Sequence, residues 1–474
     1  MNITELETDY LIIGAGAVGM AFADTLLAET DASIIIVDKH HKPGGHWNDA
    51  YSFVTLHQPS NFYGVSSTEL SSGKKDLIGL NKGMHELASG AQVMAYYEEI
   101  MNHVFLPSGR VQYFPMCEYR GDDRFASTLS EQEYRVKVKK KTIDGTYFKT
   151  SVPSTHTPNF EIADNLDFIP LNELPAQTSG HEAYVVIGGG KTGIDACLWM
   201  LQNDIDPDKI VWIMPRDAWW IDRKTAQPGQ EFFFDSMGNQ ARQMEALAEA
   251  ESIPDLFDRL EAAGTLFRLD PDVRPTMFHG ATVSQAEAEQ LRRIKNVVRQ
   301  GRVSQISTNE IKFSDSTYPI PDQTLFIDCS ARAVPVTESY PVFSGNTICV
   351  QTVRSYQPVF SASFIAHIEA NYDDEDIKNE ICGLVPLPNH DTDWLFGMAA
   401  QMKNQRRWSQ EPDLRDWLVN NRLDGFTGLT VPGPDTTQEQ LQVLGRIKQA
   451  APAAAEALKR LIPEAMSIRA KQGQ

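Results

Sequence analysis

The chain has 474 residues and a formal net charge of −20 at pH 7. Its length suffices for two or three domains, and 42% hydrophobic residues are typical of a globular protein with an ordinary core. The negative charge disfavours nucleic acid and anionic membrane surfaces as partners, and without a long apolar stretch in the sequence no membrane span is expected.

The N-terminal segment and the spacing of the cysteines indicate the cellular compartment of the protein. The acidic start, MNITELETDY, lacks the basic and apolar regions of a signal peptide. The five cysteines are far apart and form no CxxC-type cluster. This spacing argues against a zinc site and against a disulfide framework. We therefore expect a cytoplasmic protein without a bound metal.

Two strand–helix–strand units dominate the pattern. The first predicts a strand at 9–14, a helix from Val18 to about Leu27 and a strand at 33–37. The second begins far along the chain and predicts a strand at 183–187, a helix at 192–203 and a strand at 210–214. Such βαβ units build parallel sheets. The expected fold class is therefore α/β, with two Rossmann-like domains, a helical insertion and a helical C-terminal region.

Weaker patterns predict the remaining elements. Residues 134–152 resemble a hairpin, with its turn at Asp144–Gly145. Ser284 and Glu287 form a capping-box pattern for a helix that Gly301 would end. The expected elements that follow are a strand at 324–328, a helix at 357–370 and a long helix at 437–461.

The first glycine motif is GAGAVG at 14–19. In a strand-to-helix turn, Gly14 permits the sharp bend, Gly16 lets a pyrophosphate approach the backbone, and Gly19 allows close helix–strand packing. Asp38 stands at the end of the next strand, where a carboxylate accepts both ribose hydroxyls. The full pattern predicts a dinucleotide site.

The second glycine motif, GGGKTG at 188–193, predicts another dinucleotide turn at Gly188, Gly190 and Gly193. After the following strand comes Arg216 in place of an acidic residue. An arginine there suits a 2′-phosphate, so NADPH is favoured over NADH. Asp217 follows directly, and the alternative is that Arg216 forms a surface ion pair.

With two such motifs, the chain resembles the two-dinucleotide-binding-domain flavoproteins, most of all the flavin-containing and Baeyer–Villiger (class B) monooxygenases. The GGHW segment at 44–47 resembles the family's GGxW, TLFIDCSAR at 324–332 lies where the family has its late ATG strand, and the helix starting near Gln357 resembles the closing helix that faces the flavin. The resemblance implies FAD at the first site, bordered by Gly45, His46, Trp47 and Gln357.

The chain departs from the family pattern at several points. The fingerprint FxGxxxHxxx(W/Y/F), expected shortly before the second glycine motif, is absent. Lys191 and Thr192 stand where family members have a small residue before the third glycine. The late strand is followed by Asp-Cys-Ser-Ala rather than Ala-Thr-Gly.

The electron acceptor is inferred by weighing alternatives. A disulfide reductase needs a cysteine pair soon after the first βαβ unit, but the first cysteine is Cys117. A membrane quinone reductase would favour a basic amphipathic C-terminal helix, whereas 437–461 is rich in alanine. Oxygen remains, which predicts a monooxygenase that inserts one atom of O₂ into a small organic substrate. The alternative is an NAD(P)H-binding flavoprotein without oxygenase activity: an oxidase, a reductase, a sensor or an assembly partner.

Candidate catalytic residues come from the segment 47–63, the expected wall of a substrate pocket. His57 and Gln58 lie about where the related monooxygenases place a polar residue near the reactive flavin edge. The alternative for His57 is a structural hydrogen bond without proton transfer. Arg354 and Tyr356 precede the closing helix and are candidates for flavin contact or plain loop residues.

These expectations divide the chain into four parts. The FAD-binding domain begins with 1–178, and 179–323 form the NADPH-binding domain with a helical insert at about 225–300. Residues 324–372 return to the FAD-binding domain, and 373–474 form a helical C-terminal region.

Overall fold

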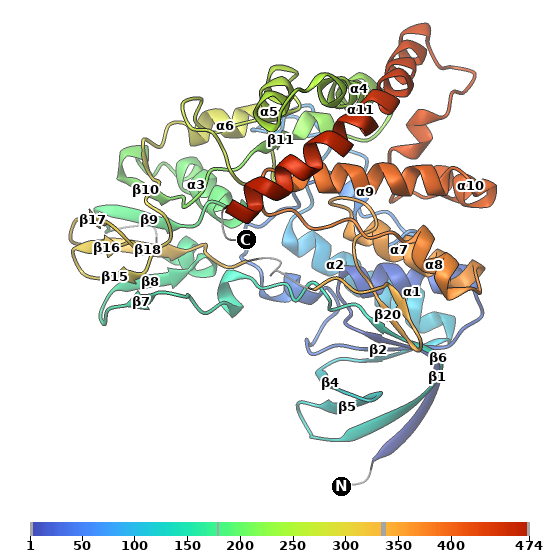
Figure 1. Cartoon of the computed structure of the whole chain (residues 1–474). Coiled ribbons are helices and arrows are strands. Elements are labelled where there is room, and N and C mark those ends of the chain that lie inside the picture. Colours follow the sequence, from blue (N-terminus) through green and yellow to red (C-terminus); the bar gives the residue numbers. More distant parts are fainter. Residues whose placement is uncertain (1–2, 178–179, 333–337, 472–474) are drawn as a thin grey trace.

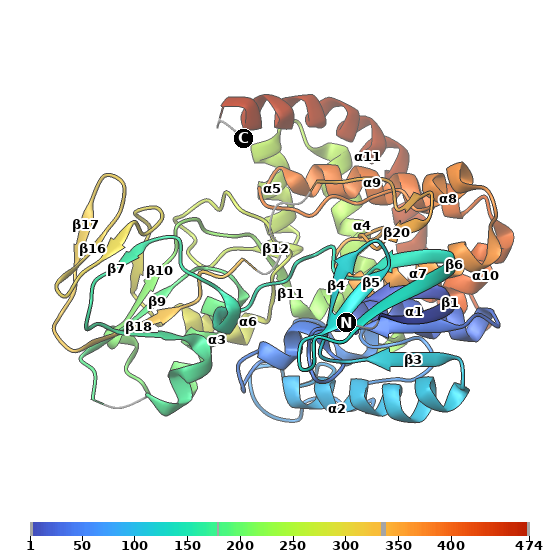
Figure 2. The ribbon, with the colours of Figure 1, turned by 90° about the horizontal axis from the view of Figure 1, so that it is seen from below.

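The computed structural model describes residues 3–177, 180–332 and 338–471. Two large sheets, the first mixed and the second parallel, lie at opposite ends of the molecule, and helices of the insert and of the C-terminal region pack between and over them (Figures 1 and 2). The predicted fold class, α/β with two Rossmann-like domains and added helical regions, is confirmed.

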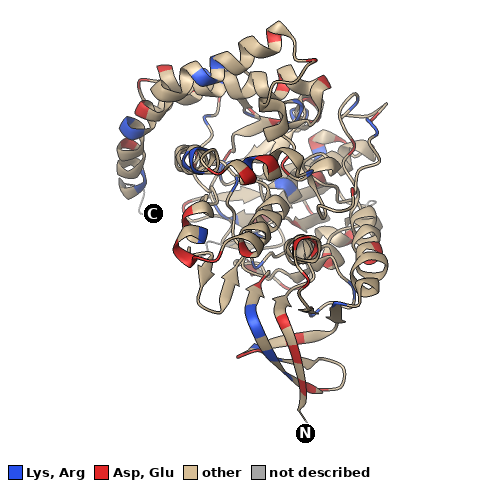
Figure 3. Cartoon of the chain, turned by 90° about the vertical axis from the view of Figure 1, so that its right-hand side faces the viewer, with Lys and Arg blue, Asp and Glu red and all other residues tan. Residues whose placement is uncertain are grey.

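The first sheet has the strand order β19-β20-β6-β1-β2-β3, with β4 and β5 attached at β6. β1 pairs in parallel with β2 and with β6, as the first βαβ unit predicts. Near the N-terminus, acidic side chains of β1 pair with basic side chains of β6, including Lys137 with Glu7 at 2.9 Å (Figure 3). The strands are β1 (Thr4–Ile13), β2 (Ile34–Val37), β3 (Val111–Phe114), β4 (Cys117–Gly121), β5 (Arg124–Ser127), β6 (Glu133–Asp144), β19 (Phe343–Ser344) and β20 (Thr347–Cys349).

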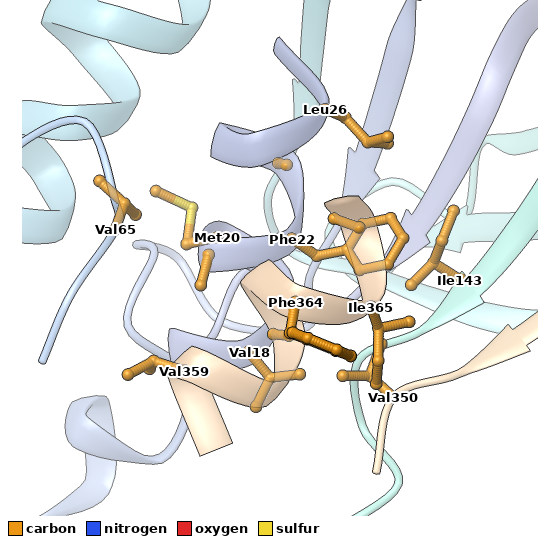
Figure 4. Packing of buried hydrophobic residues seen from close by; sticks show 14 of the residues in the cluster. Val18, Met20, Phe22, Leu26, Val65, Ile143, Val350, Val359, Phe364 and Ile365 are labelled. Atoms are coloured by element: carbon orange, nitrogen blue, oxygen red, sulfur yellow. The ribbon is translucent and has the colours of Figure 1, made fainter. Parts of the chain in front are cut away.

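Two helices pack together against the first sheet. α1 (Ala17–Glu29) and α7 (Pro358–Asn371) are buried along most of their length. Figure 4 shows Phe22 of α1 beside Phe364 and Ile365 of α7. A helix that is apolar on nearly all sides belongs inside a core, and this packing directs the N-termini of both helices to the carboxyl edge of the sheet. α2 (Gly90–Ile100) packs against the same core.

The second sheet has the order β14-β10-β9-β18-β8, and all its neighbours pair in parallel. Its central strands are buried along their whole length, as expected of a parallel sheet covered on both faces. The strands are β8 (Asp167–Pro170), β9 (Ala183–Ile187), β10 (Ile210–Ile213), β14 (Asn296–Val298) and β18 (Thr324–Asp328), with α3 (Lys191–Gln202) after β9. A small sheet beside it comprises β7 (Glu161–Ile162), β15 (Gln305–Ile306), β16 (Glu310–Lys312) and β17 (Thr317–Pro319).

The insert is helical, as predicted, but also contains a small sheet of β11, β12 and β13. Its long helix α4 packs along the C-terminal helix α11 in a shared apolar core. The insert elements are β11 (Trp220–Asp222), α4 (Phe233–Glu249), α5 (Ile253–Ala262), β12 (Leu266–Phe267), β13 (Thr282–Val283) and α6 (Gln285–Leu291).

The C-terminal region is helical, as predicted, and it is tied to the first domain. Arg422 donates hydrogen bonds to the backbone carbonyls of Asn61 at 2.7 Å and Thr68 at 3.1 Å. Among the described helices, none combines the length and apolarity required to cross a membrane. The helices are α8 (Glu375–Ile381), α9 (Asp393–Trp408), α10 (Pro412–Asn420) and α11 (Gln438–Lys471).

The hairpin predicted at 134–152 was wrong. Residues 133–144 form the single strand β6, which pairs in parallel with β1 and β20. Gly145 does not reverse the strand; its amide donates to the Ile13 carbonyl at 3.0 Å, and a Cβ on Gly145 would lie 3.4 Å from the Cα of Gly19. The chain therefore passes close behind the first glycine turn, and the glycine serves that approach.

Two further expectations were wrong in detail. The capping box of Ser284 and Glu287 is present, but its helix ends at Leu291, because 296–298 join the second sheet as β14. The strand at 324–328 does not return to the first domain; it pairs with β9 and β8. The described chain rejoins the first sheet at β19 and β20, while β7 and β8 already leave it before residue 178.

Candidate functional site

The first glycine turn has the geometry that its motif predicts. Gly14 adopts a φ of +97° and donates its amide to the Val37 carbonyl at 2.8 Å. A Cβ on Gly19 would lie 1.9 Å from the Gly14 carbonyl oxygen, so a larger residue would separate α1 from the turn. Gly16 stands at the N-cap of α1, where backbone N–H groups remain for an anion.

Asp38 is buried at the end of β2, beside this turn. One carboxylate oxygen accepts a hydrogen bond from the Ala15 amide at 2.6 Å, and the other accepts from the His40 amide at 2.7 Å. The His40 ring lies 2.8 Å from the same carboxylate and 3.0 Å from Asp49. The hydrogen bond to Asp38 raises the pKa of His40 above its usual range. The sequence motif identified Asp38, but it gave no signal for its neighbour His40.

The GGHW segment closes over the first turn. Gly45 has a φ of +58°, and a Cβ on it would lie 2.9 Å from the Cα of Gly16. Trp47 donates its indole N–H to the Tyr63 hydroxyl at 2.7 Å, and the His46 ring stacks on Trp47. Burial lowers the pKa of His46 to about 4, so the ring is neutral near pH 7. The segment thus places a rigid aromatic pair beside the turn.

The start of α7 contains buried polar groups. Gln357 is 5% exposed, and its side-chain oxygen has no hydrogen-bond partner among the described residues. Arg354 pairs with buried Asp424 at 2.7 Å and lies over the Phe360 ring. The Arg354 side chain thus ties the C-terminal region to α7, whereas the Gln357 oxygen makes no such contact with the described residues. Tyr356 packs on Phe278, outside this cluster.

The second glycine turn repeats the geometry of the first. Gly188 has a φ of +131°, and a Cβ on it would lie 2.3 Å from the Cys329 carbonyl oxygen. A Cβ on Gly193 would lie 2.0 Å from the Gly188 carbonyl oxygen, which also accepts from the Trp212 indole at 2.8 Å. A Cβ on Gly190, at the N-cap of α3, would point into open space. That face of the turn therefore has room for a ligand.

Several cations gather at the carboxyl edge of the second sheet. Arg216 is half-buried and donates to the Asn389 side chain at 3.0 Å. Burial and the charges of Arg302 and Arg332 lower the pKa of Arg216. Asp217 turns away and receives two hydrogen bonds from Arg299, at 2.7 and 3.1 Å. Asp217 is thus paired elsewhere. The charges of Arg302 and Arg332, which the sequence did not single out, act on Arg216, and the charges of Asp391 and Asp393 act on it in the opposite direction.

A pocket with an empty volume of about 290 Å³ lies between the two domains. His57 belongs to the first domain, Lys191 to α3 and Arg223 to the insert. Gln58 is half-buried next to His57 and does not line the pocket. The full lining is Thr55, His57, Lys191, Ile194, Asp195, Leu198, Arg223, Thr282, Val283 and Glu287.

The polar groups around His57 fix its position and its charge. Arg223 donates to the His57 backbone carbonyl at 3.2 Å and pairs with buried Glu287 at 2.6 Å. Burial, followed by the charges of Lys191 and Arg223, lowers the pKa of His57 well below its usual range. The pocket therefore contains a neutral imidazole, which can donate one hydrogen bond and accept another.

Comparison with known proteins gives a family match and several relatives. A model for an NAD(P)-binding Rossmann-like domain matches residues 12–62. An uncharacterized protein of Mycobacterium tuberculosis is 47% identical over 427 residues, which cover 90% of this chain and 79% of the relative. The chain belongs to the same family as this mycobacterial protein. The uncharacterized oxidoreductase CzcO of Bacillus subtilis is 22% identical over 228 residues, 45% of this chain and 61% of that protein.

Solved structures similar to the chain include two monooxygenases. Polycyclic ketone monooxygenase from Thermothelomyces thermophila has 11% identity and a TM-score of 0.49, covering 98% of this chain and 88% of that one. A flavin-containing monooxygenase from Stenotrophomonas maltophilia has 12% identity and a TM-score of 0.41, covering 77% and 97%. The predicted two-dinucleotide-domain fold itself is confirmed by the βαβ unit in each of the two sheets and, for the first domain, by the Rossmann-like match.

Proposed function

We propose that the protein is an FAD-dependent oxidoreductase that uses NADPH, and that it acts as a monooxygenase on a small organic substrate with O₂. The observation that carries the proposal is a pocket lined by Thr55 and His57 of the first domain and by Lys191 at the second glycine turn. Hydride transfer between a nicotinamide and a flavin requires the two rings to meet. A pocket between the domains is where two such cofactors would meet.

The residues of the first domain fit FAD. The N–H groups at Gly16 would hold the pyrophosphate, Asp38 would accept ribose hydroxyls, and Trp47 would border the ring. The unpartnered oxygen of Gln357 supports the fit, because a buried acceptor without a donor is costly. Its location at the positive end of α7 suits negative charge on a reduced ring. When bound, the flavin supplies electron transfer from the nicotinamide to oxygen.

The residues of the second domain fit NADPH. Open space at Gly190 leaves room for the pyrophosphate at the start of α3. Arg216, Arg302 and Arg332 would supply positive charge at the position of the 2′-phosphate. This doubly charged anion would in turn neutralise the repulsion between the arginines. In a chain with a net charge of −20, such a local cluster provides the attraction that the rest of the surface lacks.

The neutral His57 gives the pocket a hydrogen-bonding group without adding a charge. Arg223 holds the His57 backbone, and the apolar side chains of Ile194, Leu198 and Val283 help to exclude water. We assign His57 the role of orienting substrate or oxygen, with Gln58 as a neighbouring candidate.

The test is a substrate screen with purified protein, FAD and NADPH. Compounds that accelerate NADPH oxidation are incubated with isotopically labelled O₂, and the products are analysed by mass spectrometry. We expect one labelled oxygen atom in the product. Release of hydrogen peroxide equal to the NADPH consumed, with every compound tried, would contradict oxygen insertion.

The absent fingerprint before the second glycine motif favours a second candidate: an NAD(P)H-binding flavoprotein without oxygenase activity. Mixing the flavin-loaded protein with NADPH in the absence of oxygen separates an enzyme whose flavin accepts hydride from a sensor or assembly partner. Rapid bleaching of the flavin absorbance supports an enzyme that transfers hydride. A flavin that neither NADPH nor NADH reduces supports the second candidate in its sensor or assembly form.

A further inference from the structure

The pocket between the domains contains a lysine where the resembled family has a small residue. Lys191 is the first residue of α3 and follows Gly190 directly. Its ammonium pairs with Asp195 one helical turn further along. Asp195 also accepts a hydrogen bond of 2.6 Å from the hydroxyl of Tyr51, which belongs to the first domain. Lys191 is therefore fixed at the junction of the two domains.

Lys191 differs from Arg223, the other cation in this pocket. Arg223 is 3% exposed and donates to four protein acceptors, one of which, on Glu287, also neutralises its charge. The Lys191 side chain is 20% exposed, and Asp195 is the partner that the structure gives its ammonium. An ammonium has three N–H groups. Lys191 thus retains hydrogen-bonding capacity on the pocket side, whereas Arg223 is committed to the fold.

The position of Lys191 relative to the second turn indicates which anion it could meet. The open face at Gly190 is adjacent in the chain, while the cluster around Arg216 lies beyond the end of the neighbouring strand β10. A dinucleotide bound at this turn would place its 2′-phosphate at that cluster and its pyrophosphate at the start of α3. Its nicotinamide half would then continue past Lys191 toward the first domain.

We propose that Lys191 binds the nicotinamide-side phosphate of the coenzyme and thereby directs the nicotinamide into the pocket beside His57. This inference rests on the proposed function, because it requires NADPH at the second glycine turn. Lys191 would share its ammonium between Asp195 and a phosphate oxygen. Asp195 keeps the hydrogen bond from Tyr51, so the carboxylate is not left unpaired.

The test compares two ligands by isothermal titration calorimetry on the full chain. NADP⁺ contains both phosphates of the pyrophosphate, whereas adenosine 2′,5′-bisphosphate lacks the nicotinamide-side phosphate. We expect Lys191→Met to weaken NADP⁺ binding by about 10-fold to 150-fold, the range for a charged hydrogen bond. Binding of the bisphosphate should change by less than about 3-fold. Lys191→Arg should restore most of the NADP⁺ affinity.

Lys209→Met is the matched control, since Lys209 is an exposed lysine of the same domain; it should leave both affinities unchanged. Equal losses for both ligands, or no loss for either, in Lys191→Met would overturn the proposal. If Lys191→Met does not fold, Lys191→Gln provides the same comparison. If the wild-type chain binds NADP⁺ no more tightly than it binds the bisphosphate, the role of Lys191 is refuted, while the coenzyme site itself is not. A wild-type chain that binds neither refutes the coenzyme site, and the inference with it.

Discussion

Replacement of Arg216 by alanine tests the coenzyme assignment most directly. A charged hydrogen bond typically contributes about 1.5–3 kcal/mol, which corresponds to roughly a 10-fold to 150-fold change in Kd. We expect a loss for NADPH in the lower half of this range, for two reasons. Arg302 and Arg332 would still supply positive charge to the 2′-phosphate, and the variant no longer has the repulsion between these two arginines and Arg216. NADH lacks the 2′-phosphate, so its affinity should hardly change.

The assay is direct titration of NADP⁺ and NAD⁺ into wild type and variant at fixed ionic strength, because exposed charges are screened by salt. Arg293→Ala is a suitable control, since Arg293 is exposed in the same domain and bonds to the neighbouring Gln290. That variant should bind both coenzymes as wild type does. Equal losses of affinity for NADP⁺ and NAD⁺ in Arg216→Ala would show that the arginine supports the fold through its hydrogen bond to Asn389 and does not bind the 2′-phosphate.

Three further predictions concern the first domain and the pocket. Gly16→Val should yield protein without bound flavin, because a larger side chain would occupy the space next to the backbone N–H groups; a yellow variant with full flavin content would refute the FAD assignment. His57→Ala should leave flavin reduction by NADPH nearly intact while converting oxygen use into hydrogen peroxide release, measured as peroxide per NADPH; unchanged coupling would remove His57 from the mechanism. The raised pKa of His40 means that its protonated form stabilises the fold fully below its unfolded pKa of about 6.5, and that this stability is lost as pH rises through the higher folded pKa. His40→Asn should therefore flatten the fall in melting temperature above about pH 6.5, and parallel pH profiles for wild type and variant would contradict the linkage to Asp38.

The glycine turns of the candidate site were predictable from the sequence, because the backbone geometry of each turn depends on residues within that turn. At Gly14 and Gly188 the backbone needs a positive φ, and at Gly19 and Gly193 it needs a missing Cβ. These requirements act over a few residues, so they leave a motif that can be recognised. The place of Gln357 at the start of α7 was predictable for a similar reason, because the helical periodicity of 357–370 is local. Its assignment to FAD came from the family resemblance and stays a prediction.

Groups that meet only across the fold left no such signal. Arg302 and Arg332 reach Arg216 because three parallel strands end at one edge of the second sheet. Arg223 bonds to His57 and Glu287, each far away in the chain. No periodicity or spacing links these residues before the sheet order is known.

The sequence by itself determined the two βαβ units, the glycine turns and the helical character of the insert and C-terminal region, because hydrophobic periodicity and backbone sterics are local. Tertiary structure alone decided which strands pair. An apolar strand fits any parallel sheet, and so 324–328 joined β9 instead of the first domain, and β6 joined β1 instead of folding back as a hairpin. Tertiary structure also brought Lys191, Asp195 and Tyr51 together at the domain junction. The free energy of such contacts depends on burial that exists only after both domains have packed.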